Sequence, residues 1–141
     1  MFIDASALCA ILLNEPDAPI MLKALEGTRG KAIISPVVRV ETMLRIARDF
    51  ADQRNSPTVG EEDFEKAKEH VGALLEAIGV REMHITESMG KAAIEALKKY
   101  GKVAGHPAKL NMGDAFAYAV AKAYHAPLLY KGDDFSKTDL A

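Results

Sequence analysis

The chain has almost no cysteine, no long apolar run and no excess of basic charge. Its single cysteine, Cys9, excludes an internal disulfide and is typical of a protein kept in a reducing cytosol. No apolar run approaches the roughly 18 residues that a membrane-spanning helix needs. The opening residues Met1–Ser6 reach an acid at once and lack the basic region of a signal peptide. We therefore expect a cytoplasmic protein with no membrane segment.

The charges are nearly balanced, with 18 Lys and Arg against 20 Asp and Glu and a net charge of −2. A global basic footprint, the usual sign of a nucleic-acid binder, is therefore missing. Nucleic-acid binding is not excluded, because acids gathered around a metal would mask a local basic rim. The histidines lie apart from one another and from Cys9, so no zinc-site spacing is present.

Apolar segments and amphipathic segments alternate along the 141 residues. The strand-like segments are Met1–Ile3, Ala32–Ile34, Val80–Ile85 and Pro127–Tyr130. The helical patterns are Ala5–Leu13, Ala18–Glu26, Val37–Phe50, Glu61–Ile78, Thr86–Tyr100 and Gly113–Tyr124, and loops are expected over Ala51–Gly60 and Lys102–Met112. This alternation predicts one α/β domain, residues 1–141, with a mostly parallel sheet covered by helices on both faces.

Acidic residues recur where these predicted strands end and helices begin. Asp4 follows the first strand, and the carboxyl edge of a parallel sheet is where open α/β folds bind ligands. Asp is also a common helix N-cap, which is the plainer explanation. Glu41 falls in the second turn of its helix, where an ion pair with Arg45 four residues later is the plainer explanation.

Two further acidic positions also lie where a predicted helix begins or a predicted strand ends. Asp114 opens an apolar helix, where it complements the helix dipole, although Asn111 could serve as the cap instead. A carboxylate at a buried helix start is costly unless something cationic meets it. Asp133 and Asp134 directly follow the last strand, where a turn at Gly132 is the alternative. Four such acids together favour a site for a hard divalent cation such as Mg²⁺, which takes oxygen ligands.

Four segments carry a family resemblance, and they cover both ends and part of the middle of the chain. They are MFIDASALCAILLNEP, SPVVRVETMLRIA, LNMGDAFAYAVAKAY and PLLYKGDDFSKTDL. The chain resembles PIN-domain ribonucleases, and specifically the VapC toxins of bacterial toxin–antitoxin pairs. The resemblance implies a three-layer α/β/α sandwich and Mg²⁺-dependent cleavage of RNA, with Mn²⁺ as a substitute.

The resemblance also assigns roles to the acids. Asp4 and Asp114 match the principal metal ligands of the family, and Glu41 matches its helix carboxylate. The fourth acid maps onto Asp133 or Asp134, and we favour Asp133. Ser6 matches a small hydroxyl residue that would orient the first acid.

The family further implies partners, namely an RNA substrate, a cognate VapB-type antitoxin and a second copy of the chain in a homodimer. An antitoxin arginine would pair with the carboxylates, and exposed apolar residues would seat an amphipathic segment. Candidates for this apolar surface are Ile20, Leu22 and Met43. Candidate phosphate contacts are Arg39, Arg45, Arg48, Lys102, Lys109 and Lys131.

Two other classes of protein compete with the ribonuclease. A phosphorylated receiver domain also carries acids at strand ends, but it gives no reason for Glu41 in a helix. A catalytically inactive PIN-fold protein-interaction module would be expected to have lost some acids, and here all four positions are filled.

Overall fold

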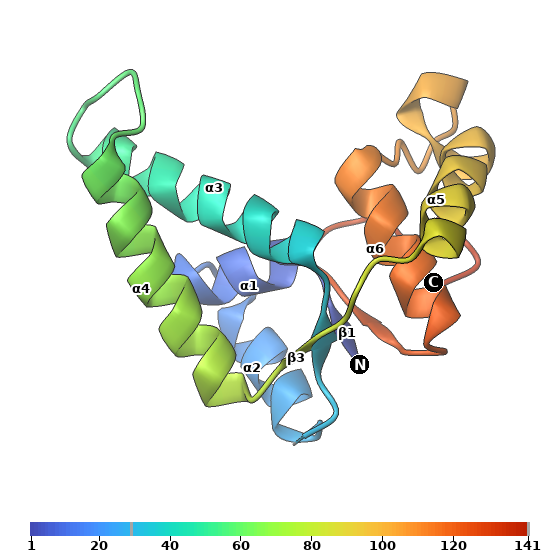
Figure 1. Cartoon of the computed structure of the whole chain (residues 1–141), viewed down its shortest axis with the longest axis horizontal. Coiled ribbons are helices and arrows are strands. Elements are labelled where there is room, and N and C mark those ends of the chain that lie inside the picture. The colour runs from blue at the N-terminus through green and yellow to red at the C-terminus, as the bar shows by residue number, and fades with distance from the viewer. Residues whose placement is uncertain (29, 141) are drawn as a thin grey trace.

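Four short parallel strands lie at the centre of the computed structural model, which describes residues 1–28 and 30–140 (Figure 1). They are β1 (Phe2–Ile3), β2 (Ile33–Ile34), β3 (Arg81–Glu82) and β4 (Leu128–Leu129), in the sheet order β3-β2-β1-β4. Phe2 of β1 pairs with Ile33 on one side and Leu128 on the other, and every strand pair of the sheet is parallel. The expected parallel sheet is confirmed, with strands shorter than their apolar segments.

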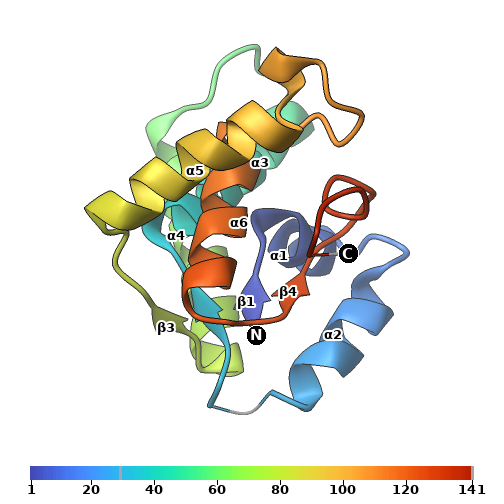
Figure 2. The same cartoon turned by 90° about the vertical axis from the view of Figure 1, so that its right-hand side faces the viewer.

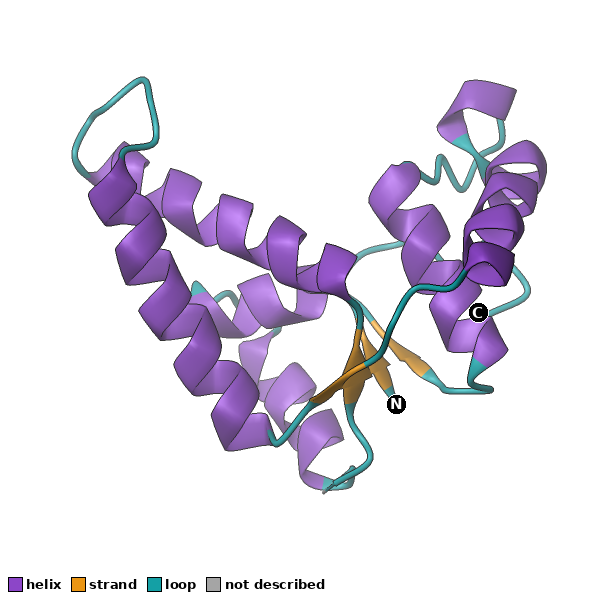
Figure 3. Cartoon of the chain, in the orientation of Figure 1, coloured by secondary structure: helices purple, strands orange, loops and turns teal. Residues whose placement is uncertain are grey.

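Helices cover both faces of this sheet. One side holds α1 (Ala5–Leu12), α2 (Ala18–Glu26), α3 (Pro36–Gln53) and α4 (Glu61–Ile78), as Figure 3 makes clear. The other side holds α5 (Glu87–Tyr100) and α6 (Met112–Ala123), which pack closely on each other (Figure 2). The three-layer α/β/α arrangement expected from the sequence is therefore confirmed.

The helix starts follow from local capping. Ser35 is fully buried and accepts a hydrogen bond from the backbone N–H of Val38 at 3.4 Å, and Pro36 follows it in the first turn. Asn111 caps α6 by accepting a bond from the N–H of Asp114 at 2.9 Å. These caps place two helix starts beside the carboxyl ends of the strands.

Several expected boundaries were wrong, and one apolar residue of α4 lies outside its buried face. Helix α3 continues through Gln53, because Ala51 is fully buried and extends the contact between α3 and α4. Phe64 of α4 is 40% exposed, because the buried face of this helix consists of Asp63, Ala67, Val71 and Leu75.

The remaining differences concern the expected strand Val80–Ile85 and the loop Lys102–Met112. Only Arg81–Glu82 forms a strand, and both side chains are exposed at the sheet edge. The loop contains a short 3₁₀ helix, Lys102–Ala104, and its last residue already belongs to α6. Within the described ranges, none of the helices is long and apolar enough to cross a membrane.

The sheet order fixes where a ligand site can lie. From β1 the chain builds outward through β2 to β3, and then returns to the opposite side of β1 with β4. The order therefore reverses between β1 and β4, and the crevice at the carboxyl ends of the strands opens at such a reversal. Asp4 is the residue that leaves β1 at this point.

Candidate metal centre

Asp4 lies between β1 and α1 and is only 6% exposed. Its backbone N–H donates to the Leu129 carbonyl of β4 at 2.9 Å, which fixes the position of its backbone on the sheet. One carboxylate oxygen accepts from the backbone N–H of Ser6 at 3.0 Å and from its hydroxyl at 2.5 Å. Burial raises the pKa of Asp4, and these bonds from Ser6 act in the opposite direction. Asp4 is thus a helix cap and a buried acid at once.

Ser6 connects the acid to the segment that follows β4. Its hydroxyl donates to Asp4 and accepts from the backbone N–H of Lys131 at 3.0 Å. A side chain that bridges positions 125 residues apart in the sequence holds the two sides of the crevice in register. Ser6 is therefore placed to orient the Asp4 carboxylate.

Glu41 reaches the same region from α3. Its carboxylate lies against Gly113 of α6, where a Cβ atom would fall 2.6 Å from Oε1 and closer still to Oε2. Burial, together with the charges of Asp4 and Asp114, raises the pKa of Glu41 to about 7. Within the described chain Glu41 forms no ion pair, so the plainer explanation of a Glu41–Arg45 pair does not hold.

Asp114 completes the start of α6. Its Oδ2 accepts from the backbone N–H of Asn111 at 2.9 Å, while Asn111 caps the helix in return. Burial raises the pKa of Asp114 to about 6, and the charges of Asp4 and Asp134 add to this effect. Asp114 therefore shares in the capping, and its carboxylate also lies in the field of the other acids.

The two acids after β4 differ in their surroundings, although both are exposed. Asp134 is close enough for its charge to raise the pKa of both Asp4 and Asp114. The carbonyl of Asp133 accepts from the N–H of Ser136 at 3.1 Å and from its hydroxyl at 2.6 Å, as in a turn. The structure thus groups Asp134 with the other acids, whereas our sequence-based preference was Asp133.

The donor set fits a hard divalent cation. Across residues 1–28 and 30–140, no three acidic, His or Cys side chains converge as they stand on one point suited to a metal ion. Yet Asp4, Glu41 and Asp114 are at least partly buried, influence one another's ionisation and have no ion pair in the described chain. Burial, and to a smaller extent their mutual repulsion, raises the pKa values of these acids, and a cation between them would offset both effects. Carboxylate oxygens are the ligands that Mg²⁺ prefers.

Three of the six candidate phosphate contacts are occupied by protein partners. Arg39 binds Glu82 through two nitrogens, and Arg48 binds Asp52 and two backbone carbonyls. Lys131 is held by Glu15 and Asp17. Arg45, Lys102 and Lys109 form no ion pair in the described chain. Of these three, Arg45 lines a hollow that Ser6 and Glu41 also line.

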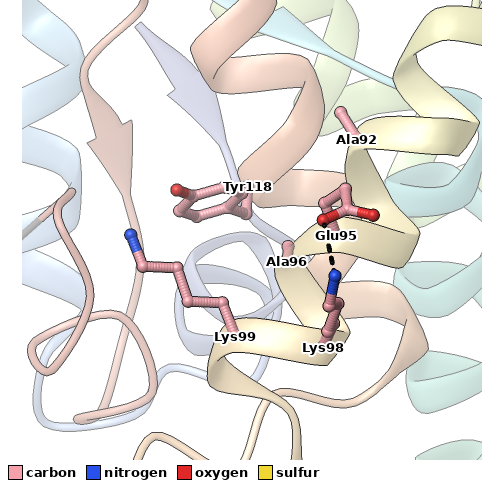
Figure 4. A pocket seen from close by; sticks show the side chains of 6 residues that line it. All are labelled: Ala92, Glu95, Ala96, Lys98, Lys99 and Tyr118. Carbon is pink, nitrogen blue, oxygen red and sulfur yellow. Dashed lines mark ion pairs between the residues drawn. The ribbon is translucent and has the colours of Figure 1, made fainter.

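A separate hollow lies where α5 packs on α6 (Figure 4). Its only acid, Glu95, is paired with Lys98 at 3.7 Å, and the other lining residues are Ala92, Ala96, Lys99 and Tyr118. This hollow contains none of the four acids. The candidate metal site is therefore the group of acids at the carboxyl edge of the sheet.

The fold and this acidic site define a class of protein. The PIN domain family matches residues 1–140. A solved structure of a sarcin–ricin-loop-cleaving VapC20 toxin of Mycobacterium tuberculosis has a TM-score of 0.68, at 19% identity, over 96% of this chain and 92% of that one. The toxin–antitoxin complex from Klebsiella pneumoniae has a TM-score of 0.64, at 16% identity, over 99% of this chain and 92% of that one. At such identities the two structures show the fold alone.

Sequence relatives narrow the class further. A VapC ribonuclease of Rhizobium meliloti (strain 1021) is 43% identical over 144 aligned positions, which cover 99% of this chain and 98% of the relative. Ribonuclease VapC42 of Mycobacterium tuberculosis (strain H37Rv) is 32% identical over 140 positions, with 99% and 96% coverage. The chain therefore belongs to the PIN domain family and, within it, to the VapC ribonucleases.

Proposed function

We infer that this chain is an endoribonuclease that hydrolyses RNA phosphodiester bonds and acts as the toxin of a VapBC-type pair. One observation carries this conclusion: Asp4, Glu41 and Asp114, at least partly buried and without ion pairs in the described chain, lie near the switch point of the sheet. The chain that forms this site is 43% identical, end to end, to a VapC ribonuclease. We take residues 1–141 as one PIN domain, and the cytoplasm, where RNA is abundant, as its place of action.

The residues have distinct roles in this proposal. Asp4 and Asp114 would hold the divalent cation, Mg²⁺ in the cell with Mn²⁺ as a substitute, and Glu41 would complete the carboxylate set. When bound, the cation supplies activation of a water nucleophile and neutralises charge at the phosphate. Ser6 keeps the Asp4 carboxylate in one orientation through its hydroxyl.

The fourth acid is proposed to be Asp134. Its charge reaches both Asp4 and Asp114, which supports it over Asp133. Phe135 is 1% exposed and anchors the segment directly after this acid. Replacing each aspartate singly by asparagine decides between them, because only the loss of the acid that serves the site should reduce cleavage strongly.

The test of this function is cleavage of total bacterial RNA by the purified chain. We expect cleavage with Mg²⁺, none in excess EDTA, and recovery when Mg²⁺ is restored. Asp114→Asn should abolish the activity, whereas Glu65→Gln on the exposed face of α4 serves as the matched control and should leave it unchanged. Undiminished cleavage in excess EDTA, or by Asp114→Asn, would contradict the proposal.

A cognate antitoxin and a homodimer complete the proposed system. An apolar groove borders Glu41. This groove supports the proposal of an antitoxin, because an amphipathic antitoxin segment bound there could bring a cation to the acids. Its lining includes Val40, Leu44 and Met112, which are 56%, 52% and 68% exposed. Of the apolar residues expected from the sequence, Ile20 and Leu22 are exposed, but Met43 packs against the core.

A further inference from the structure

The hollow between α1 and α3 borders the acidic site and contains cationic side chains. It is lined by Ala5, Ser6, Cys9, Glu15, Glu41, Arg45 and Lys131. Two of these residues, Ser6 and Glu41, also belong to the proposed metal centre. A molecule that occupies this hollow therefore lies next to the centre where RNA would be cleaved.

The two cations of the hollow are not equivalent. The Lys131 ammonium is held by Glu15 and also approaches Asp17 at 3.6 Å, so its charge is already balanced. Arg45 is exposed and has no ion pair within residues 1–28 and 30–140. The other arginines of α3, Arg39 and Arg48, are both paired with acids. Arg45 is thus the uncommitted cation of the helix that carries Glu41.

The buried thiol of Cys9 lies within reach of the charges of both Arg45 and the acids. Burial raises the pKa of this thiol; the charge of Arg45 lowers it, and the charges of Asp4 and Glu41 raise it further. All three charges therefore lie around one point at the base of the hollow. The Arg45 guanidinium is near these acids but forms no ion pair with any of them in the described chain.

RNA needs such a cation at this place. The acids of the site repel a polyanionic strand, and a bound divalent ion offsets only part of their charge. A guanidinium offers a planar pair of donors that matches two phosphate oxygens, and it stays charged at any physiological pH. We propose that Arg45 and the hollow between α1 and α3 form a binding subsite for a backbone phosphate of the RNA, next to the phosphate that is cleaved.

This subsite rests on the proposed ribonuclease function, and its test is binding rather than cleavage. The probe is a fluorescent 12-nucleotide single-stranded RNA of mixed sequence, titrated with the Asp114→Asn protein at several KCl concentrations in Mg²⁺. In that background, Arg45→Gln should weaken binding about tenfold, as expected for a lost charge-assisted hydrogen bond. It should also reduce the slope of log K against log salt by about 0.7, the value for one phosphate contact on a single strand.

Two variants make the result specific. Arg48→Gln removes a cation of the same helix that is already paired with Asp52, so its affinity and salt slope should match those of the parent. Arg45→Lys should keep the salt slope and lose part of the affinity, because an ammonium lacks the planar fork. Equal affinities and slopes for the Arg45→Gln and Arg48→Gln proteins would overturn the subsite. Mg²⁺-dependent cleavage by the wild-type chain would then still support the ribonuclease. A parent protein that does not bind RNA, together with a wild-type chain that does not cleave it, would overturn the function itself.

Discussion

At the scale of single residues, Glu41 has the clearest dependence on pH. Its folded-state pKa is about 7, raised from an ordinary value of 4.5 by burial and by two neighbouring acids. Above pH 7 the Glu41 carboxylate is therefore charged in the native protein, and this charge is less favourable there than in the unfolded chain. Between these two pKa values the folded state binds more protons than the unfolded state, so stability falls as pH rises through this window.

We expect the metal-free protein to be more stable near pH 5 than near pH 8. Glu41→Gln should flatten this dependence, by an amount on the order of 1 kcal/mol because the side chain is only half-buried. The measurement is urea unfolding in EDTA at both pH values, with Glu65→Gln as the control that keeps the wild-type slope. Parallel curves for the wild-type and Glu41→Gln proteins would show that the acid is not held in a repulsive site.

At the scale of elements, the approach of α3 to α6 at Gly113 brings two of the acids together. The Glu41 carboxylate lies in the space that any other residue at position 113 would fill. Gly113→Ala should therefore displace Glu41 and reduce RNA cleavage on the order of 100-fold, as expected when a catalytic group moves by about 1 Å. The fold should persist, because the displaced group is the end of a flexible side chain.

The matched control for this variant is Gly72→Ala in α4, where nothing lies within 4 Å of an added Cβ. It should leave cleavage unchanged and raise stability by about 0.5–1 kcal/mol, as Ala replaces Gly in a helix. In a Glu41→Gln background, Gly113→Ala should cost little further activity, because the group it displaces is already lost. A full additional loss there would mean that Gly113 acts by another route.

The elements themselves were largely predictable from local patterns. Ser35 followed by Pro36, and Asn111 before an Ala-rich run, mark helix starts that the structure places within one residue of expectation. Helix faces were less predictable, because Val40 and Leu44 have helical spacing but border an open groove. Their exposure depends on which surface α6 leaves uncovered, and this is set by tertiary packing.

The site was predictable as a set of residue types, and less so as a geometry. Asp4, Glu41 and Asp114 follow strand ends or begin helices, which is a local property of the sequence. The role of Gly113 could not be read locally, since the need for glycine arises from a carboxylate 72 positions away in the sequence. The role of Arg45 could not be read locally either. The sequence does not show that Arg39 and Arg48 form ion pairs in the fold whereas Arg45 forms none in the described chain.

At the scale of the whole molecule, a ribonuclease toxin should harm the cell that makes it. We expect expression of the chain alone in a bacterial host to stop growth, and co-expression of the small gene encoded beside it to restore growth. Asp4→Asn should be harmless without that gene, because it removes a proposed metal ligand while leaving an isosteric helix cap. Unimpaired growth despite strong expression of folded wild-type protein would count against the toxin.

The central claim is that the acids at the carboxyl edge of the sheet form one metal site, and calorimetric titration of Mn²⁺ into the metal-free protein tests it most directly. At pH 6.5, near the raised pKa values of Glu41 and Asp114, the wild-type protein should bind Mn²⁺ and release protons, seen as a binding enthalpy that depends on the buffer. At pH 8 this proton release should largely disappear, and at either pH Asp4→Asn should bind much more weakly. Equal Mn²⁺ affinity in the wild-type and Asp4→Asn proteins, or no binding by the wild type, would contradict the account.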